Sequence, residues 1–267
     1  MVVSDPHTVL WHDLECGSYT ADLPLWRELA DAVAASGTTG AEDPARGSAG
    51  AILDVGAGSG RVALELARAG HRMTALDLDA ELLAALRERA AGMPVETVRA
   101  DARAFELERR DFALCIAPMQ TVQLLGGTDG RVEFLRRARA HLRPGALLVC
   151  AIATEIEPFD CDAGDLGPSP EIARVNGVSY ISRTTRVRVS RRGARIERER
   201  AVLAGAEGAE GARRAQPAWV RDVVELDRVT VSQLEREGRS AGLVPAGTRV
   251  IAATEEHTAS VAVMLGA

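Results

Sequence analysis

Apolar and polar positions follow two different rhythms along this chain of 267 residues. From residue 51 onward, short continuous apolar runs alternate with segments in which apolar residues recur every three to four positions. Continuous runs are typical of fully buried strands and the recurring pattern is typical of amphipathic helices, so their alternation predicts a doubly wound α/β core around a parallel sheet. The predicted strands are 51–55, 72–78, 95–100, 112–117 and 146–152, and the predicted helices between them are 61–70, 80–90 and 130–142.

Beyond about residue 156 the period of the pattern shortens to two positions. Residues 169–203 alternate apolar and polar side chains around a turn near Arg192 and Gly193, which predicts an antiparallel hairpin. The other segments are predicted to be a helical region at 5–36, a polar linker at 38–50, a Gly/Ala/Glu-rich loop at 204–215, a strand within 219–231, a helix at 231–243 and a closing strand pair at 248–254 and 260–266.

Composition and charge narrow the range of functions. Hydrophobic residues make up 46% of the chain and charged residues 26%, which is typical of a folded globular protein. The 32 basic and 38 acidic side chains give a net charge of −6, which favours a small-molecule ligand over nucleic acid or an acidic membrane surface. All the basic residues are arginine, and the absence of lysine excludes a lysine Schiff base, a lysine nucleophile and a phosphate-loop lysine.

Cysteine spacing and the lengths of the apolar runs set further expectations. The four cysteines, Cys16, Cys115, Cys150 and Cys161, show no C-x-x-C spacing, so we expect no zinc site or other metal and no disulfide framework. The N-terminus lacks a basic segment followed by an apolar stretch, and no run approaches the roughly 18 apolar residues of a membrane span. We therefore expect a cytoplasmic, reduced protein with no membrane partner.

The strongest motif is the glycine-rich segment DVGAGSG, which ends the first predicted strand. Gly56, Gly58 and Gly60 let the backbone pass close to a ligand, and the helix that follows offers free N–H groups at its N-terminus. We therefore expect a nucleotide-like ligand on this loop. A dinucleotide fingerprint would place its third glycine one position later, where this chain has Arg61.

Two aspartates follow the glycine loop at the ends of the next two predicted strands. Asp77 ends the second strand about 20 residues further on, where a carboxylate can accept hydrogen bonds from both ribose hydroxyls. Asp79 beside it is expected to cap the next helix. Asp101 closes the third strand, where it can accept a hydrogen bond from an adenine amino group while the Ala102 backbone meets the ring; the alternative for Asp101 is a loop acid without a ligand.

At these residues the chain resembles the class I S-adenosylmethionine-dependent methyltransferases. DVGAGSG matches the family's D-x-G-x-G-x-G loop, Asp77 its ribose acid, Asp101 and Ala102 its adenine contacts, and HLRPGALLV the turn before its fifth strand. The resemblance covers residues 51–155 and the final strands. It implies S-adenosylmethionine as cofactor and S-adenosylhomocysteine as product. The cofactor contacts that it implies are Tyr19, Trp26, Asp54, Gly56, Ala57, Gly58, Gly60, Asp77, Leu78, Asp101, Ala102, Arg103, Ala117, Met119 and Gln123.

The resemblance also implies an architecture. It is a Rossmann-like seven-stranded sheet with strand order 3-2-1-4-5-7-6 and helices on both faces, joined by an N-terminal helical lid and an antiparallel β insertion. We expect a lid and linker at 1–48, an S-adenosylmethionine-binding core at 49–155, an insertion at 156–229 that caps the substrate or makes a dimer contact, and the last helix with the closing strands at 230–267. The order of elements is similar to the small-molecule subset, such as sugar amine and glycine N-methyltransferases.

Candidate acceptor contacts come from the N-terminus and from the loop after the fourth strand. Aromatic faces can meet a cationic sulfonium or amine, and similarity to glycine N-methyltransferases implies that Tyr19 and Trp26 touch the methionine end of the cofactor. The alternative is that these rings pack the helix onto the core. Ligands of open α/β sheets bind at the carboxyl ends of strands, and that loop lacks the N-P-P-[YF] signature of enzymes that methylate nucleic-acid amino groups. The candidate substrate contacts are Trp11, Tyr19, Met119 and Gln120.

The expected reaction is in-line transfer of a methyl group to an amine, or else to a hydroxyl, of a small molecule. A hydroxyl acceptor needs a general base, whereas a neutral amine attacks with its own lone pair. His257, between the last two strands, is a candidate base or a surface turn residue. Glu155, after the fifth strand, is a candidate amine-binding residue or a loop residue.

Eight arginines between residues 183 and 200 keep other functions open. The period-two pattern puts Arg186 and Arg188 on one face and Val187 on the other, as in a half-exposed sheet, and no aromatic residues interleave as base-stacking platforms. A solvated sheet face is the first interpretation, and a homodimer contact or an RNA methyltransferase that uses this hairpin are the others. A nicotinamide-dependent Rossmann oxidoreductase and a protein that binds the cofactor without transferring methyl also remain as alternatives.

Overall fold

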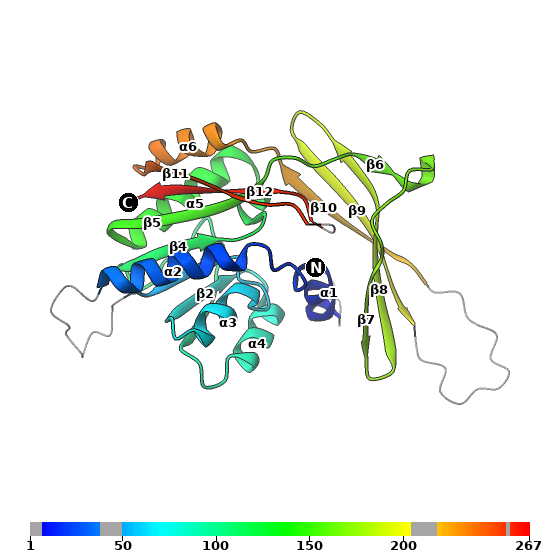
Figure 1. Cartoon of the computed structure of the whole chain (residues 1–267), viewed down its shortest axis with the longest axis horizontal. Coiled ribbons are helices and arrows are strands. Elements are labelled where there is room, and N and C mark those ends of the chain that lie inside the picture. The colour runs from blue at the N-terminus through cyan, green and yellow to red at the C-terminus, as the bar shows by residue number, and fades with distance from the viewer. Residues whose placement is uncertain (1–6, 38–49, 204–217, 255–256) are drawn as a thin grey trace. The chain divides into compact units, whose positions relative to one another are not determined.

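The computed structural model describes residues 7–37, 50–203, 218–254 and 257–267, which fall into two compact units (Figure 1). The core unit comprises Tyr19–Glu155 and Asp227–Ala267. The insertion unit comprises Met1–Ser18 and Ile156–Leu226. The predicted linker at 38–50, apart from its last residue, and the whole predicted loop at 204–215 lie outside the described residues.

The core unit is built on a seven-stranded sheet with the order β11-β12-β5-β4-β1-β2-β3. All pairs between β1, β2, β3, β4 and β5 are parallel, and β12 is antiparallel to both of its neighbours. The predicted strand order with a reversed last strand is therefore confirmed. The strands are β1 (Ile52–Val55), β2 (Met73–Asp77), β3 (Val95–Arg99), β4 (Phe112–Ala117), β5 (Leu142–Ala153), β11 (Val244–Ile251) and β12 (Ser260–Gly266).

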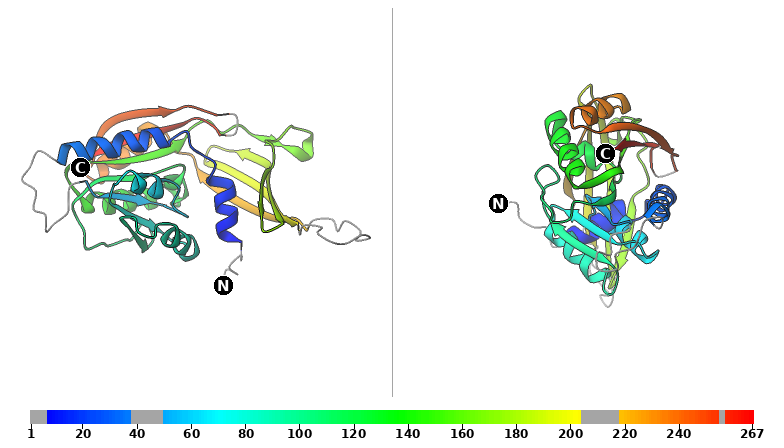
Figure 2. Two further views of the ribbon diagram at one scale, coloured as in Figure 1. Left: turned by 60° about the horizontal axis from the view of Figure 1, so that its bottom comes forward. Right: turned by 90° about the vertical axis from the view of Figure 1, so that its left-hand side faces the viewer.

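Helices cover both faces of this sheet (Figures 1 and 2). Ile52 packs in one hydrophobic cluster with residues of α2, α3 and α4, whereas its neighbour Leu53 packs in a second cluster with residues of α5 and α6. Each large side chain buried in this way stabilises the fold by roughly 1.5–3 kcal/mol, which explains why the central strands are mostly apolar, with Asp54 of β1 as an exception. The helices are α2 (Leu23–Gly37), α3 (Arg61–Arg68), α4 (Ala80–Arg89), α5 (Gly127–His141) and α6 (Val231–Ser240), with a short 3-10 helix η1 (Thr121–Leu124).

The insertion unit holds an antiparallel sheet with the order β10-β9-β8-β6, and β7 also pairs with β8. The predicted hairpin is the β8–β9 pair, and its turn is closed by a 2.8 Å hydrogen bond from the Ser190 N–H to the Gly193 carbonyl. The elements are α1 (Thr8–Cys16), β6 (Phe159–Asp160), a 3-10 helix η2 (Cys161–Ala163), β7 (Glu171–Val175), β8 (Val178–Val189), β9 (Gly193–Leu203) and β10 (Val220–Asp227).

Two segments differ from the sequence-based prediction. The helical pattern at 5–36 is two helices, α1 in the insertion unit and α2 in the core unit, and they are separated at Gly17. A Cβ at Gly17 would lie 2.4 Å from the Asp13 carbonyl oxygen, so glycine is needed where α1 ends. The fifth strand begins at Leu142, so HLRPGALLV is largely strand, with a register shift against β4 where we predicted a turn. Among the described residues, no helix is long and apolar enough to cross a membrane.

Candidate functional site

The glycine loop between β1 and α3 has the backbone that its sequence predicts. Gly56, Gly58 and Gly60 have φ angles of 74°, 55° and 101°, in the left-handed region that side chains disfavour. A Cβ at Gly56 would lie 2.6 Å from Thr121, and a Cβ at Gly60 would lie 2.3 Å from Leu86. Glycine is therefore required both for the conformation and for the close approach of neighbouring elements.

The acid at the end of β2 is fastened to this loop. The Asp77 carboxylate accepts one hydrogen bond from the Gly58 N–H, at 2.8 Å, and another from the Asp79 N–H, at 2.9 Å. The Asp79 carboxylate caps α4 by accepting hydrogen bonds from the N–H groups of Glu81 and Leu82, which confirms the predicted cap. Parallel pairing of β1 with β2 thus brings the predicted ribose acid and the glycine loop together at the edge of the sheet where the carboxyl ends of the strands lie.

Asp54, the first residue of the DVGAGSG motif, is a buried acid whose carboxylate makes no hydrogen bond within the part of the chain that the structure describes. Its side chain is 1% exposed, and neither carboxylate oxygen has a hydrogen-bond partner among the described residues. The pKa of Asp54 is raised to about 7, chiefly by burial; the Arg61 charge lowers it, and the charges of Asp77 and Asp22 add to the rise. The site therefore contains a buried carboxylate that takes up a proton near neutral pH.

Residues after β2 and β3 form the outer part of the same edge. Leu78, directly after β2, is 62% exposed, so its side chain is accessible to a ligand. Asp101 forms a salt bridge with Arg103 at 2.6 Å, and the hydrogen bonds from Arg103 lower the pKa of Asp101. Ala102 is half-buried and packs against the core cluster that contains α5. The predicted adenine contacts are adjacent, but Asp101 already has an ionic partner.

A cluster that the sequence analysis missed joins the start of α3 to the start of α2. Arg61 donates to both carboxylate oxygens of Asp22, at 2.6 and 2.7 Å, and to the Tyr19 carbonyl oxygen at 2.7 Å. Asp22 has no exposed side-chain surface and also accepts a hydrogen bond from the Trp26 indole N–H. The available signals were the arginine at the expected glycine position and an aspartate directly before a helix.

Tyr19 and His257 face one another within the core unit. Their ring centroids lie 4.7 Å apart, and the Arg61 guanidinium lies 5.1 Å from the Tyr19 ring centroid. Burial raises the pKa of the Tyr19 hydroxyl, which is hydrogen-bonded to Ser260. His257 is half-buried in the turn between β11 and β12, where its backbone N–H donates to the Thr254 hydroxyl. The candidate base therefore lies beside a candidate cofactor contact.

The loop after β4 contains a strained residue. Met119 has a φ of 53°, a conformation uncommon for a residue other than glycine and often found at functional sites. Ala117 before it is buried and Gln120 after it is half-buried. Glu155, two residues beyond β5, is exposed.

Two predicted cofactor contacts have other roles in the structure. Gln123 is buried, and its side-chain amide bonds to the Ala153 N–H, the Ala153 carbonyl and the Asp227 carbonyl, so it fastens η1 to neighbouring backbone. Trp26 is 0% exposed and packs in the hydrophobic cluster of α2 and α3. Buried side chains of this kind stabilise the edge of the site and present no free surface to a ligand.

Trp11 packs inside the insertion unit. It makes edge-on contact with Tyr180 of β8, with ring centroids 5.5 Å apart, and the Arg200 guanidinium lies 5.6 Å from its centroid. On the same helix, Glu15 accepts hydrogen bonds from Arg200 and from the Ser182 hydroxyl. These contacts hold α1 against the sheet of the insertion unit.

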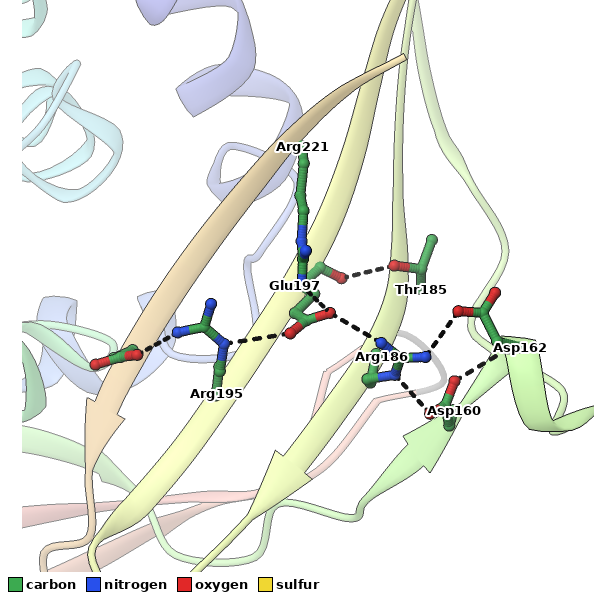
Figure 3. Close-up of polar contacts among 8 residues, drawn as sticks. Asp160, Asp162, Thr185, Arg186, Arg195, Glu197 and Arg221 are labelled. Carbon is green, nitrogen blue, oxygen red and sulfur yellow. Dashed lines mark hydrogen bonds and ion pairs between the residues drawn. The ribbon is translucent and has the colours of Figure 1, made fainter.

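The arginine-rich hairpin carries its own counter-charges. Glu197 is buried and forms ion pairs with Arg186, Arg195 and Arg221, while Arg186 also pairs with Asp160 (Figure 3). Other carboxylates pair with the remaining central arginines: Arg183 with Glu199, Arg186 with Asp162, Arg195 with Glu225, Arg198 with Glu15, and Arg200 with Glu15 and Asp222. Because successive side chains of β9 point to opposite faces, the pairs of Glu197 and those of Arg198 and Arg200 lie on opposite faces of this sheet. Both faces therefore carry ion pairs, where we predicted a solvated face.

The sequence of the core unit matches a known family. Residues 52–145 match the model of a family described as a methyltransferase domain. A curated relative, a probable cobalt-precorrin-6B C(15)-methyltransferase (decarboxylating) from Methanothermobacter thermautotrophicus, is 33% identical over 132 residues, which cover 46% of this chain. The match covers 64% of that relative, so this chain spans less than two thirds of its length.

Solved structures of similar fold span nearly the whole chain. CalS10, an S-adenosylmethionine-bound amino pentose methyltransferase from Micromonospora echinaspora, is 20% identical, with a TM-score of 0.64 and coverage of 98% of each chain. The sugar N-methyltransferase KedS8 from Streptoalloteichus is 16% identical, with a TM-score of 0.64 and coverage of 98% of this chain and 94% of its own. At these identities the likeness establishes the fold.

Proposed function

We propose that this chain, whose residues 52–145 form a methyltransferase domain, transfers a methyl group from S-adenosylmethionine to an amine of a small molecule. The observation that carries the proposal is the edge formed by β1 and β2. There the Asp77 carboxylate accepts from the Gly58 N–H, beside the buried Asp54 carboxylate. A loop with positive φ angles flanked by two acids suits a ligand that combines ribose hydroxyls with a cationic amino-acid end.

The residues of this edge fit the cofactor. Asp77 would accept from the ribose hydroxyls through its remaining lone pairs, and the exposed Leu78 would lie against the adenine. The adenine would be bordered at the end of β3 by Asp101, Ala102 and Arg103. The ion pair between Arg103 and Asp101 would either break or persist when the adenine binds. When bound, S-adenosylmethionine would supply a methyl group on a sulfonium, activated for in-line displacement by the acceptor.

The chain's own residues then position the acceptor and exclude water. Tyr19 would cover the reacting end, and Met119 and Gln120 would border the acceptor from the loop after β4. His257, stacked on Tyr19, would take the proton that an ammonium or hydroxyl acceptor must lose, and Glu155 would attract a cationic amine.

The ion pairs of the hairpin arginines favour a small-molecule amine acceptor over a nucleic acid. Five of the eight arginines between 183 and 200 pair with carboxylates inside the insertion unit, so fewer positive charges remain for phosphates. CalS10 is an amino pentose methyltransferase and KedS8 is a sugar N-methyltransferase, which supports an amino sugar as the first acceptor class to examine.

Ligand binding tests the proposal directly. Purified chain freed of carried-over ligand is titrated with S-adenosylhomocysteine and with NADH in a calorimeter and in thermal melts. We expect heat and a raised melting temperature with S-adenosylhomocysteine alone. Radiolabelled methyl transfer to a panel of amino sugars and their hydroxyl analogues then identifies the attacking atom. Absence of binding to both S-adenosylmethionine and S-adenosylhomocysteine would refute the proposal.

A further inference from the structure

The first residue of α3, Arg61, has a geometry that its position in the loop motif does not require. Its side chain is 10% exposed, and it reaches back to a segment 39 residues earlier, where Asp22 has no exposed side-chain surface. Two nitrogens of the guanidinium meet two oxygens of the carboxylate, the fork geometry that only arginine provides. One of those nitrogens also donates to the Tyr19 carbonyl oxygen.

The partners of Arg61 link two parts of the proposed site. Gly60, immediately before it, ends the glycine loop and precedes α3 with a left-handed backbone. Tyr19 lies under the same guanidinium and stacks on His257, while its hydroxyl is bonded to Ser260 at the start of β12. Arg61 at the end of the glycine loop is therefore connected, through Tyr19, with the turn between β11 and β12.

We propose that Arg61 is a positioning residue that holds Tyr19, and through it His257, in register with the glycine loop, so that cofactor binding and acceptor positioning are coupled. The inference rests on the proposed function. It assigns a role to the position where a dinucleotide-binding loop would have its third glycine. In this chain the arginine at that position holds the segment with Tyr19 and Asp22, which would cover the ligand. Arg61 acts through Tyr19 and Asp22 and contacts no reacting atom.

A second arginine bridges the same two helices and provides a matched control. Arg27 of α2 pairs with Glu65 of α3 at 2.6 Å, but its side chain is 48% exposed, whereas that of Arg61 is 10% exposed. Arg27→Met removes an α2–α3 ion pair of the surface type, whereas Arg61→Met removes the buried one. A general loosening of α2 would affect both variants alike.

The experiment combines affinity with local hydrogen exchange. We expect Arg61→Met to weaken S-adenosylhomocysteine binding by about 10- to 100-fold, Arg61→Lys by less, and Arg27→Met by less than about fivefold. Amide exchange in a peptide covering residues 19–26 should rise in Arg61→Met without ligand, and its protection by S-adenosylhomocysteine should be lost. Arg61→Lys supplies the test if Arg61→Met does not fold.

A pH profile separates positioning from simple loss of structure. Because the Arg61 charge opposes the rise in the pKa of Asp54, removing it should move the pH midpoint of S-adenosylhomocysteine affinity upward, while Arg27→Met leaves the midpoint in place. Equal affinity, exchange and pH midpoint in Arg61→Met and Arg27→Met would overturn the inference. Failure of the unmodified chain to bind S-adenosylhomocysteine would instead refute the proposed function, and the inference with it.

Discussion

Glu15 of the insertion unit and Asp54 of the core unit are both buried, but their carboxylates have opposite surroundings. In the insertion unit, Glu15 is bonded to Arg200, Arg198 and Ser182, so its charge is neutralised within the structure. In the core unit, Asp54 is buried with no hydrogen-bond partner among the described residues. The first arrangement stabilises packing, and the second leaves a carboxyl group without a hydrogen bond from the described part of the protein, at some cost in stability.

The two arrangements predict opposite responses to pH. Burial alone would raise the pKa of Glu15, but the hydrogen bond from Arg200 and the charges of Arg198 and Arg200 outweigh it, so the pKa is lowered. Stability from Glu15 is therefore present at neutral pH and is lost as the pH falls through the lowered pKa. The pKa of Asp54 is raised to about 7, so its contribution is present at low pH and is lost as the pH rises toward 7.

Removing the charge of Glu15 gives the largest expected effect. Glu15→Gln leaves Arg200 and Arg198 without their shared carboxylate, and we expect the free energy of unfolding to fall by about 3 kcal/mol at neutral pH. Urea denaturation measures it. The control is Glu199→Gln, which breaks the more exposed pair with Arg183 and should cost less than about 1 kcal/mol. Equal losses would mean that the Glu15 pairs contribute no more than surface pairs.

The second largest effect should have the opposite sign. Asp54→Asn removes a group whose ionisation opposes folding, so relative to the unmodified chain it should gain about 2–3 kcal/mol in unfolding free energy between roughly pH 5 and pH 8. Denaturation of both proteins at several pH values measures this difference. A difference that does not change with pH would show that Asp54 keeps an ordinary pKa.

Local sequence patterns predict the fold of the core unit well, because the residues that determine each strand, helix and turn are close together in the sequence. The glycine loop requires positive φ angles at Gly56, Gly58 and Gly60, and glycine marks such positions in the sequence itself. The strand order follows from continuous apolar runs and the family resemblance, and Asp77 meets Gly58 because β1 and β2 pair in parallel.

Interactions between distant segments could not be predicted in the same way. Arg61 and Asp22 are 39 residues apart, and Glu15 and Arg200 are 185 apart, so no local period connects the partners. Gln123 and Trp26 were assigned to the cofactor from the family resemblance, and in the structure their polar groups are bonded to neighbouring residues. Pairing choices of this kind depend on the assembled fold.

Two neighbouring acids of the core unit, Asp77 and Asp79, should differ in their effect on ligand binding. Asp77→Ala should weaken S-adenosylhomocysteine binding by about 1–3 kcal/mol, because charge-assisted hydrogen bonds to the ribose and to the Gly58 N–H are lost. Asp79→Ala, two residues away, removes the cap of α4 and should cost about 1 kcal/mol of stability while leaving the affinity unchanged. Calorimetry on both variants measures this, and equal affinities would remove Asp77 from the site.

The smallest effect compares the chain's two tyrosines, one in each unit. Tyr19→Phe keeps the ring stacked on His257 but removes the hydroxyl bonded to Ser260, so we expect a stability loss of about 1 kcal/mol and a turnover slowed by less than about tenfold. Tyr180→Phe keeps the edge-on contact with Trp11 and should turn over at the unmodified rate. Steady-state kinetics with the best acceptor of the panel measures both. If Tyr180→Phe slowed turnover more than Tyr19→Phe, the functional hydroxyl would lie in the insertion unit, and the division of labour between the two units would have to be reversed.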